Sequence, residues 1–141
     1  MDTRPILFNT AEYQASLALR ARILRHPLGK ELSSADVCGE EAQWHIGCFD
    51  GRHLVGCVVA KPLPGGKGAK LRQMAVDPQY QGQGIGRQLL QYVEQFLGAQ
   101  GITDLELSAR QTAIGFYEKL GFFVEGELYL EQGIEHIKMR K

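Results

Sequence analysis

Apolar residues recur with two different periods along the chain, and the changes of period divide it into strands and helices. Short apolar or alternating runs bounded by Gly, Pro and Asp predict strands. The expected strands are residues 6–8, 43–49, 53–60, 70–76, 105–108, 122–130 and 134–139. Asp50-Gly51 predicts a hairpin turn between the second and third of these strands, and the Pro- and Gly-rich residues 62–68 predict another turn.

Helical spacing replaces this pattern in three stretches. The apolar faces are Tyr13, Leu17, Ala21 and Leu24 in the first, Ile85, Leu89, Leu90, Val93, Phe96 and Leu97 in the second, and Ile114, Tyr117 and Leu120 in the third. Asn9 is expected to cap the first helix, and Pro27 to end it, because a proline disfavours helical geometry in the residue before it. Gly121 is expected to end the third helix in a left-handed conformation, with Phe122 folding back onto the last turn. Residues 30–42 are expected to form a polar loop with a helical turn near residues 33–37.

The order of these elements predicts the fold class. Antiparallel strands in the first half and a strand–helix–strand unit in the second predict a mixed sheet in an α/β (α+β) protein. The chain has 141 residues, which is enough for one domain with a buried core. No repeat, low-complexity tract or linker divides it, so residues 1–141 are expected to form a single domain.

Charge and cysteine content exclude several classes of partner. The chain carries 16 basic and 16 acidic residues, for a formal net charge of zero, and this balance gives no reason to expect nucleic acid or a membrane surface as a partner. The three cysteines, Cys38, Cys48 and Cys57, lack the spacing of a zinc site and fit a reducing compartment, so no metal is expected. Without an apolar signal segment, a cytoplasmic location is expected.

The most informative stretch is residues 71–90, where an apolar strand ends at Asp77-Pro78 and a glycine-rich loop leads into the second helix. Glycines let the backbone turn tightly and approach a ligand, and a helix N-terminus offers unpaired N–H groups and a positive dipole end. Together these features predict a site for phosphate oxygens. A dinucleotide fingerprint needs a third glycine where this chain has Arg87, and no Gly-Lys-Ser/Thr follows, so both of those phosphate loops are excluded.

The segment Gln81–Gly86, with the pattern Gln-x-x-Gly-x-Gly, resembles the acyl-CoA pyrophosphate loop of the GNAT acetyltransferase superfamily. Residues 113–122, AIGFYEKLGF, resemble a second pattern of that superfamily and follow at the expected distance. The resemblance covers roughly residues 43–139. It implies a mixed, mostly antiparallel sheet of six to seven strands with a central splay, flanked by about four helices. Arg110 stands where many members have asparagine.

The resemblance implies acetyl-CoA as co-substrate, bound largely by backbone groups. The implied cofactor-binding residues are Met74, Ala75, Val76, Gln81, Gly82, Gln83, Gly84, Ile85, Gly86, Arg87 and Tyr117. The N–H of Val76 would then stabilise negative charge developing on the thioester oxygen. Tyr117 is the candidate acid that protonates the departing thiolate, and its alternative role is that of a core tyrosine.

The base and the acceptor site are expected from less regular segments. Glu131 and His136, in the C-terminal hairpin, are candidates for removing a proton from the acceptor amine. An ordinary half-buried strand histidine is the alternative for His136. Arg22 and Arg25 are candidates for binding an anionic group of the acceptor in two-pronged fashion, because the guanidinium matches carboxylate geometry. A solvated helix face is the alternative for these arginines.

These residues predict an acetyl-CoA-dependent N-acetyltransferase. It would move an acetyl group directly from the thioester to a primary amine of a small acceptor, one that can carry negative charge. Two rival functions stay open at this point. One is a non-catalytic acyl-CoA-binding or sensing module, and the other is an acetyltransferase acting on protein lysines or N-termini. A homodimer also stays open.

Overall fold

A single seven-stranded sheet organises residues 1–141 in the computed structural model, with strand order β1-β2-β3-β4-β5-β7-β6. The strands are β1 (Asp2–Ile6), β2 (Trp44–Asp50), β3 (His53–Pro62), β4 (Gly68–Val76), β5 (Asp104–Arg110), β6 (Phe123–Glu131) and β7 (Ile134–Arg140). Only β4 and β5 pair in parallel, so the mixed, mostly antiparallel sheet is confirmed.

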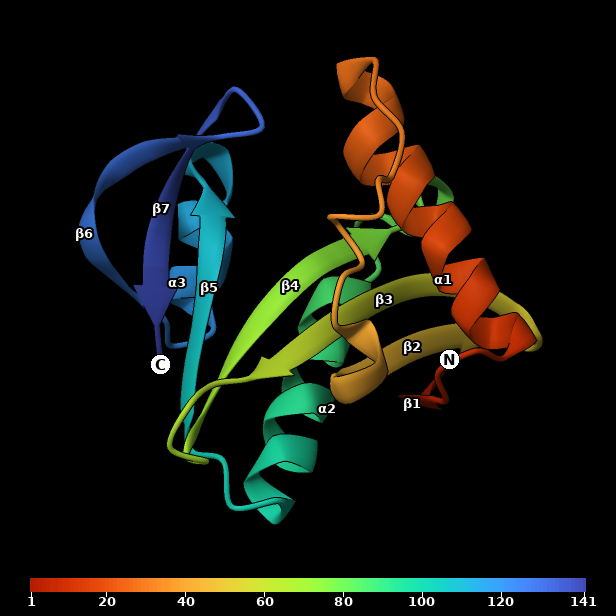
Figure 1. The fold of residues 1–141 in the computed structure, drawn as a ribbon, viewed down its shortest axis with the longest axis horizontal. Coiled ribbons are helices and arrows are strands. Elements are labelled where there is room, and N and C mark those ends of the chain that lie inside the picture. The colour runs from red at the N-terminus through yellow and green to blue at the C-terminus, as the bar shows by residue number, and fades with distance from the viewer.

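Three α-helices flank the sheet, α1 (Ala11–Arg20), α2 (Ile85–Ala99) and α3 (Ile114–Lys119). They are fewer than the four expected, because residues near 33–37 form turns only. A π-helical turn at Ala21–Arg25 and a 3-10 turn at His26–Leu28 extend α1 to the upper edge of the molecule in Figure 1. None of the helices is long and apolar enough to cross a membrane.

The sheet is buried on both faces where α1 and α2 cover it. Alternate residues of a strand point to opposite faces, and on β3 Cys57 belongs to the cluster under α1, whereas Val58 belongs to the cluster under α2. The α2 cluster is the larger core, with 19 buried residues against 7 under α1. This core holds β2, β3 and β4 as a rigid platform.

The first strand and the first cap differ from the expectation. β1 spans Asp2–Ile6 and pairs with β2 along its whole length, whereas residues 7 and 8 lie outside any strand. Asn9 adopts a left-handed turn with φ 60°, and Thr10 is the cap, because its hydroxyl accepts the N–H of Tyr13 at 3.2 Å. The prediction of Asn9 as the cap was wrong by one residue.

The end of α3 follows the expected pattern. Gly121 has φ 94°. Its N–H donates to the Glu118 carbonyl at 3.0 Å, and the Phe122 N–H reaches back to the Tyr117 carbonyl at 3.1 Å. This pair of bonds satisfies carbonyls that the helix leaves unpaired. The prediction of a left-handed glycine with Phe122 folded back is confirmed. The bond from Phe122 also holds the backbone of Tyr117 at the end of α3.

A central splay separates β4 from β5. The two strands pair only from Gly68–Leu71 on β4 to Asp104–Leu107 on β5. Beyond these residues they diverge, and β5 continues with β7 and β6 as a separate wing (Figure 1). Peptide groups on the facing edges of both strands therefore lack a strand partner. The splay implied by the resemblance is confirmed.

A β-bulge in β4 decides which of its peptide groups face the splay. Between the pairs Val59–Arg72 and Cys57–Ala75, β3 has one residue and β4 has two, Gln73 and Met74. The Asp77 N–H donates to the Val55 carbonyl on β3 at 2.8 Å. Because amide directions alternate along a strand, the N–H groups of Val76 and Met74 point away from β3, toward the gap left by β5.

Candidate active site

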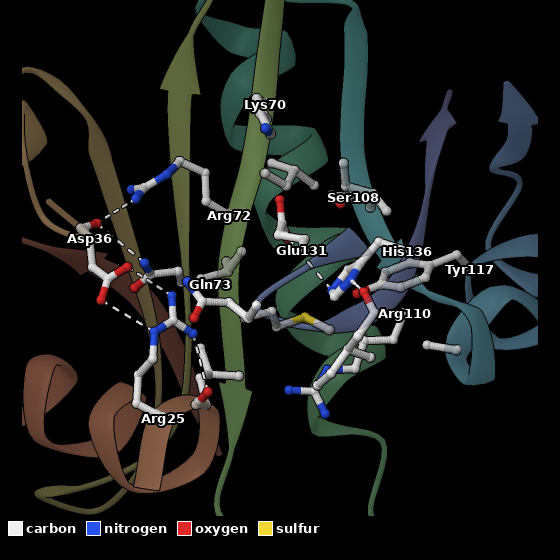
Figure 2. Close-up of a pocket in the computed structure, with 18 of the residues that line it drawn as sticks. Arg25, Asp36, Lys70, Arg72, Gln73, Ser108, Arg110, Tyr117, Glu131 and His136 are labelled. Carbon is white, nitrogen blue, oxygen red and sulfur yellow. Dashed lines mark hydrogen bonds and ion pairs between the residues drawn. The ribbon is translucent and has the colours of Figure 1, made fainter. Parts of the chain in front are cut away.

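A cavity of about 390 Å³ fills the splay between β4 and β5. Met74 lines it from β4, Ser108 from β5, Tyr117 from α3 and His136 from β7 (Figure 2). Leu24 and Arg25, in the π-helical turn after α1, form another wall of the cavity. Segments far apart in the sequence thus converge where the sheet has lost its hydrogen bonds.

The glycine-rich loop lies next to one residue of the cavity wall but does not itself line the cavity. Met74 lines the cavity, and its Cε lies 3.7 Å from the position that a Cβ would take on Gly86. Gly84 caps α2 with φ 78°, and no atom lies within 4 Å of where its Cβ would be. The first helical hydrogen bond of α2 runs from the Gln88 N–H to the Gly84 carbonyl at 2.9 Å, so the preceding amides have no acceptor within the helix. These residues fit the pyrophosphate of a CoA ester.

Ala75 and Val76, two further implied cofactor residues, contribute backbone groups while their side chains pack in the core. The side chain of Ala75 is buried in the cluster under α1, and that of Val76 packs against the larger core. Their side chains therefore pack in the protein, while the Met74 and Val76 amides face the splay. A pantetheine arm needs such unpaired backbone groups, so this edge of β4 fits the arm of CoA.

Tyr117 reaches the cavity from α3 and is half-buried. Its ring packs edge-to-face against Phe122, with centroids 5.9 Å apart, and against Phe116. Burial raises the pKa of the Tyr117 hydroxyl above its ordinary value of 10. The hydroxyl therefore stays protonated near neutral pH and can donate a proton or a hydrogen bond into the cavity.

His136 is buried on β7, with its ring held from three sides. Its Nδ1 lies 2.8 Å from the Ile134 carbonyl and its Nε2 lies 3.6 Å from a carboxylate oxygen of Glu131. The ring also stacks on Tyr129, whose hydroxyl bonds to Ser108. Since a carbonyl can only accept, Nδ1 carries a hydrogen, and Nε2 of the neutral ring is left with its lone pair.

The two candidate arginines for the acceptor lie in different places. Arg25 lines the cavity, but Asp36 holds it through two bonds, from Nε at 3.2 Å and from Nη2 at 2.9 Å. Arg22 does not line the cavity. It is about half exposed and lies 3.3 Å from Asp77, at the start of the segment that leads to the glycine loop. The π-helical turn between them sends the two side chains in different directions.

Sequence reasoning missed several charged groups of this cavity. Lys70 and Arg72 on β4 and Asp36 in the loop after α1 all line it. Arg72 is occupied by Glu40 at 3.0 Å, by Gln43 and by the Asp36 carbonyl, whereas Lys70 has no carboxylate within 4 Å. The alternation of polar Lys70 and Arg72 with apolar Leu71 was the available signal, because it puts both cations on one face of the strand.

A hydrogen bond joins the two walls of the splay near the turn between β6 and β7. The ammonium of Lys30, after the 3-10 turn that follows α1, donates to the side-chain oxygen of Gln132 at 2.9 Å. Gln132 lies in the turn between β6 and β7. This bridge joins the two walls of the splay at the end farthest from their common strand pairing (Figure 1).

The Arg25–Asp36 pair should make stability depend on pH in acid. Hydrogen bonds from Arg25 lower the pKa of Asp36 from 3.8 to about 2. A carboxylate whose pKa is lowered by folding stabilises the folded state in full above its unfolded pKa, and the stabilisation is lost as the pH falls toward the folded pKa. Asp36→Asn should therefore unfold about 2 kcal/mol more easily at pH 6, and the difference should vanish near pH 2. Urea unfolding of both proteins between pH 6 and pH 2 measures this, and a constant difference would show that the pair is not the cause.

Comparisons with known proteins agree with this geometry. Residues 13–122 match the acetyltransferase (GNAT) family. An uncharacterized Bacillus subtilis protein, YyaT, is 30% identical over 111 residues, which cover 79% of this chain and 73% of that protein. The [ribosomal protein bS18]-alanine N-acetyltransferase of Escherichia coli is 46% identical over a shorter stretch of 57 residues, 38% of each chain.

The fold likewise has a solved counterpart of nearly the same length. The crystal structure of an acyl-CoA N-acyltransferase from Pseudomonas aeruginosa superimposes with a TM-score of 0.84 at 23% identity, covering 99% of this chain and 98% of that one. The splay, the glycine loop and the family match lead to one conclusion: this chain is an N-acetyltransferase that belongs to the GNAT family.

Proposed function

We propose that this protein transfers an acetyl group directly from acetyl-CoA to the primary amine of a small acceptor. The supporting observation is the cavity in the splay, where Met74 on the free edge of β4 meets Tyr117 and His136. Met74 also lies beside Gly86 at the start of α2, so a ligand that binds the glycine loop could reach the cavity along β4. A non-catalytic CoA-binding module would not require a buried imidazole with a free nitrogen at the same place.

The chain binds acetyl-CoA chiefly through its backbone in this proposal. Amides from Gly82 to Arg87 hold the pyrophosphate, and the Met74 and Val76 amides pair with the pantetheine arm and the thioester oxygen. Bound acetyl-CoA supplies an activated acetyl group with a thiolate as leaving group. The amide of Val76 stabilises the negative charge that appears on the carbonyl oxygen when the amine attacks.

His136 accepts the proton from the acceptor amine. Its Nε2 has a free lone pair, because Nδ1–H donates to the Ile134 carbonyl. Glu131, 3.6 Å from Nε2, stabilises the imidazolium once the proton has moved. Tyr117 gives its hydroxyl proton to the departing sulfur. Burial keeps this hydroxyl protonated until the thiolate forms, although the raised pKa makes it a weaker acid. One proton leaves the amine and one reaches the thiol, so the products are neutral, and the proton on His136 returns to Tyr117 through solvent.

A small acceptor suits the acceptor end of the cavity. The Lys30–Gln132 bridge closes the path that an extended polypeptide would take between the two walls. Four cations, Arg25, Lys70, Arg72 and Arg110, line the cavity against two carboxylates, Asp36 and Glu131. This excess of positive charge favours an acceptor with an anionic group in addition to its amine.

A protein N-terminus is the second candidate acceptor, because the 57-residue match is to an enzyme that acts on an alanine of a ribosomal protein. Transfer to a peptide would require the Lys30–Gln132 contact to open. A panel of small acidic amines and of short peptides, incubated with acetyl-CoA and the protein, separates the two. Release of free thiol with the amines alone supports the proposal, and release with the peptides alone overturns it.

Gly84→Val should remove acetyl-CoA binding. A β-branched residue at φ 78° costs about 1–2 kcal/mol of strain, and its side chain would fill the open space that the phosphates need. Calorimetry should detect no binding, with an unchanged far-UV circular dichroism spectrum. Gly101→Val is the matched control, since Gly101 also has a positive φ, 83°, and open space where its Cβ would be, but it follows the far end of α2. Equal affinity of both variants would remove the loop from the binding site.

His136→Gln and Tyr117→Phe should each lower turnover about 10²- to 10⁴-fold, the range for proton-transfer groups, with little change in acetyl-CoA affinity. Steady-state turnover and calorimetric acetyl-CoA affinity of both variants measure this. Wild-type turnover in His136→Gln would assign the base to water or to Glu131.

Arg25→Met should raise the KM for an anionic acceptor about 10- to 100-fold, the value of a lost charge-assisted hydrogen bond, without changing acetyl-CoA affinity. Arg22→Met is the matched comparison, and the acceptor KM should stay unchanged in it because Arg22 lies outside the cavity. Asp36→Asn should act in the opposite direction and lower the acceptor KM, because it releases Arg25 from its carboxylate. Steady-state kinetics with one acidic and one neutral amine tests all three. Equal KM values for Arg25→Met and the wild type would mean that Arg25 only holds Asp36.

A further inference from the structure

A strained glutamine lies at the point where β4 leaves β5. Gln73 has φ 48°, a conformation that costs a side-chain-bearing residue energy and that glycine normally supplies in bulges. The other two non-glycine residues with positive φ, Asn9 and Gln132, lie in turns between elements, whereas Gln73 lies within a strand. Strain of this kind persists only where the surroundings enforce it, and it concentrates at functional sites.

Both polar atoms of the Gln73 side chain are held by the protein. Its oxygen accepts the Nε–H of Arg20 at 2.7 Å, and its nitrogen donates to the Asp36 carbonyl at 3.2 Å. Glycine could adopt the same φ without strain but could make neither bond. Glutamine at this position therefore supplies two hydrogen bonds that the backbone conformation alone does not require.

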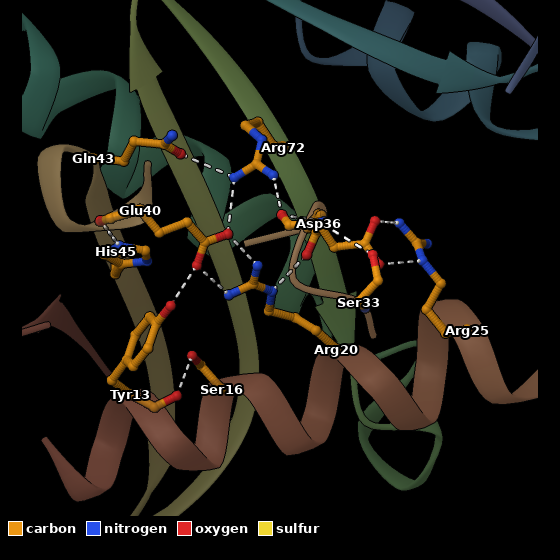
Figure 3. A network of polar contacts seen from close by, with 11 residues as sticks. Tyr13, Ser16, Arg20, Arg25, Ser33, Asp36, Glu40, Gln43, His45 and Arg72 are labelled. Atoms are coloured by element: carbon orange, nitrogen blue, oxygen red, sulfur yellow. Dashed lines mark hydrogen bonds and ion pairs between the residues drawn. The ribbon is translucent and has the colours of Figure 1, made fainter. Parts of the chain in front are cut away.

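The anchor behind Gln73 is a buried ion network (Figure 3). Arg20 and Glu40 are both fully buried and form a two-pronged salt bridge. Glu40 also accepts the hydroxyl of Tyr13 at 2.7 Å and the Nη1 of Arg72 at 3.0 Å. Burial opposes ionisation of Glu40, but the hydrogen bonds from Arg20 and Tyr13 outweigh it and keep its pKa below the ordinary value. Buried pairs of this kind add little stability but fix geometry where they are retained.

The bulge that Gln73 forms decides the direction of the β4 amides. Gln73 and Met74 together oppose the single residue Val58. Without the extra residue, every amide after it would exchange direction, because amide directions alternate along a strand. Val76 would then point its N–H at β3, and the splay would receive neither its amide nor that of Met74.

We infer that Gln73 is a positioning residue for acetyl-CoA: its side chain, clamped by Arg20 and the Asp36 carbonyl, fixes the bulge that turns the Met74 and Val76 amides toward the thioester arm. The clamp reaches from α1 through the buried network to β4. It acts through the backbone of the neighbouring residues and requires no contact between Gln73 and the ligand. This role rests on the proposed use of β4 to bind acetyl-CoA.

Three substitutions separate the side-chain anchor from the backbone conformation. Glycine and asparagine both tolerate positive φ better than glutamine, but neither can reach Arg20. In Gln73→Gly and Gln73→Asn, acetyl-CoA should therefore bind about 10-fold more weakly, as expected for the loss of one or two hydrogen bonds. Gln73→Glu keeps an acceptor for Arg20, and a carboxylate is tolerated because Arg20, Arg72 and Glu40 carry a net charge of +1 together. It loses the donor to the Asp36 carbonyl, so acetyl-CoA should bind more weakly than to the wild type but more tightly than to Gln73→Gly.

The readout is calorimetric affinity for two ligands, which requires no acceptor. The affinity for acetyl-CoA should fall in Gln73→Gly and Gln73→Asn, whereas that for 3′-phospho-ADP, the nucleotide end of CoA, should stay within about twofold, since in the proposed function its phosphates bind amides of the glycine loop and not those of β4. Asn9→Gly, which relieves the same strain in an exposed turn, is the control and should leave both affinities unchanged. Urea unfolding confirms that each variant is folded.

Arg20→Lys tests whether the effect passes through the network. A lysine keeps the charge beside Glu40 but lacks the separate Nε–H that serves Gln73, and residue 20 is fully buried and cannot touch a ligand. It should reproduce the selective loss of acetyl-CoA affinity. Wild-type acetyl-CoA affinity in Gln73→Gly, or an equal loss for both ligands, would overturn the inference. A wild-type protein that binds acetyl-CoA but acetylates no amine would instead refute the proposed function.

Discussion

The site depends on one constraint, which is that β4 and β5 can share hydrogen bonds over only four residues each. Peptide groups cannot stay buried without partners. A sheet that parts in its middle must therefore fill the gap with water or with a ligand that has hydrogen-bonding groups along its length. In the proposed function, the pantetheine arm of CoA, which carries amides along its length, pairs with this edge. The core under α2 keeps the platform rigid while the wing of β5, β6 and β7 diverges.

Local signals in the sequence were sufficient for most of the fold. Glycine spacing located the loop that leads into α2, and the left-handed Gly121 was predictable because a residue without a side chain ends a helix most easily in that way. Alternating apolar residues located the strands to within a few positions. The start of the chain was less predictable. β1 contains Arg4 and Pro5, which give no apolar alternation, and its strand geometry comes from pairing with β2.

The polar groups of the site were harder to predict, because their roles depend on partners far away in the sequence. Arg20, Arg22 and Arg25 look alike as a basic cluster, but the fold uses them for three purposes. Arg20 is buried against Glu40, Arg22 reaches Asp77, and Arg25 meets Asp36 at the cavity wall. The bulge at Gln73 was equally hidden, since a glutamine in a strand gives no sign of positive φ. Such a feature is imposed by tertiary contacts, which outweigh local preference.

Buried charge has a different purpose at each end of the cavity. Near β4, the Arg20–Glu40 pair is fully buried. It connects α1 to the bulge, so its role is to hold these two elements in position. At the acceptor end, the Arg25–Asp36 pair remains slightly exposed and can exchange partners. An acceptor carboxylate that binds Arg25 must compete with Asp36, and the energy needed to separate that pair is subtracted from its affinity. If Arg25 binds the acceptor as proposed, the same pair stabilises the fold and weakens acceptor binding, and it keeps the cavity wall ordered before the acceptor arrives.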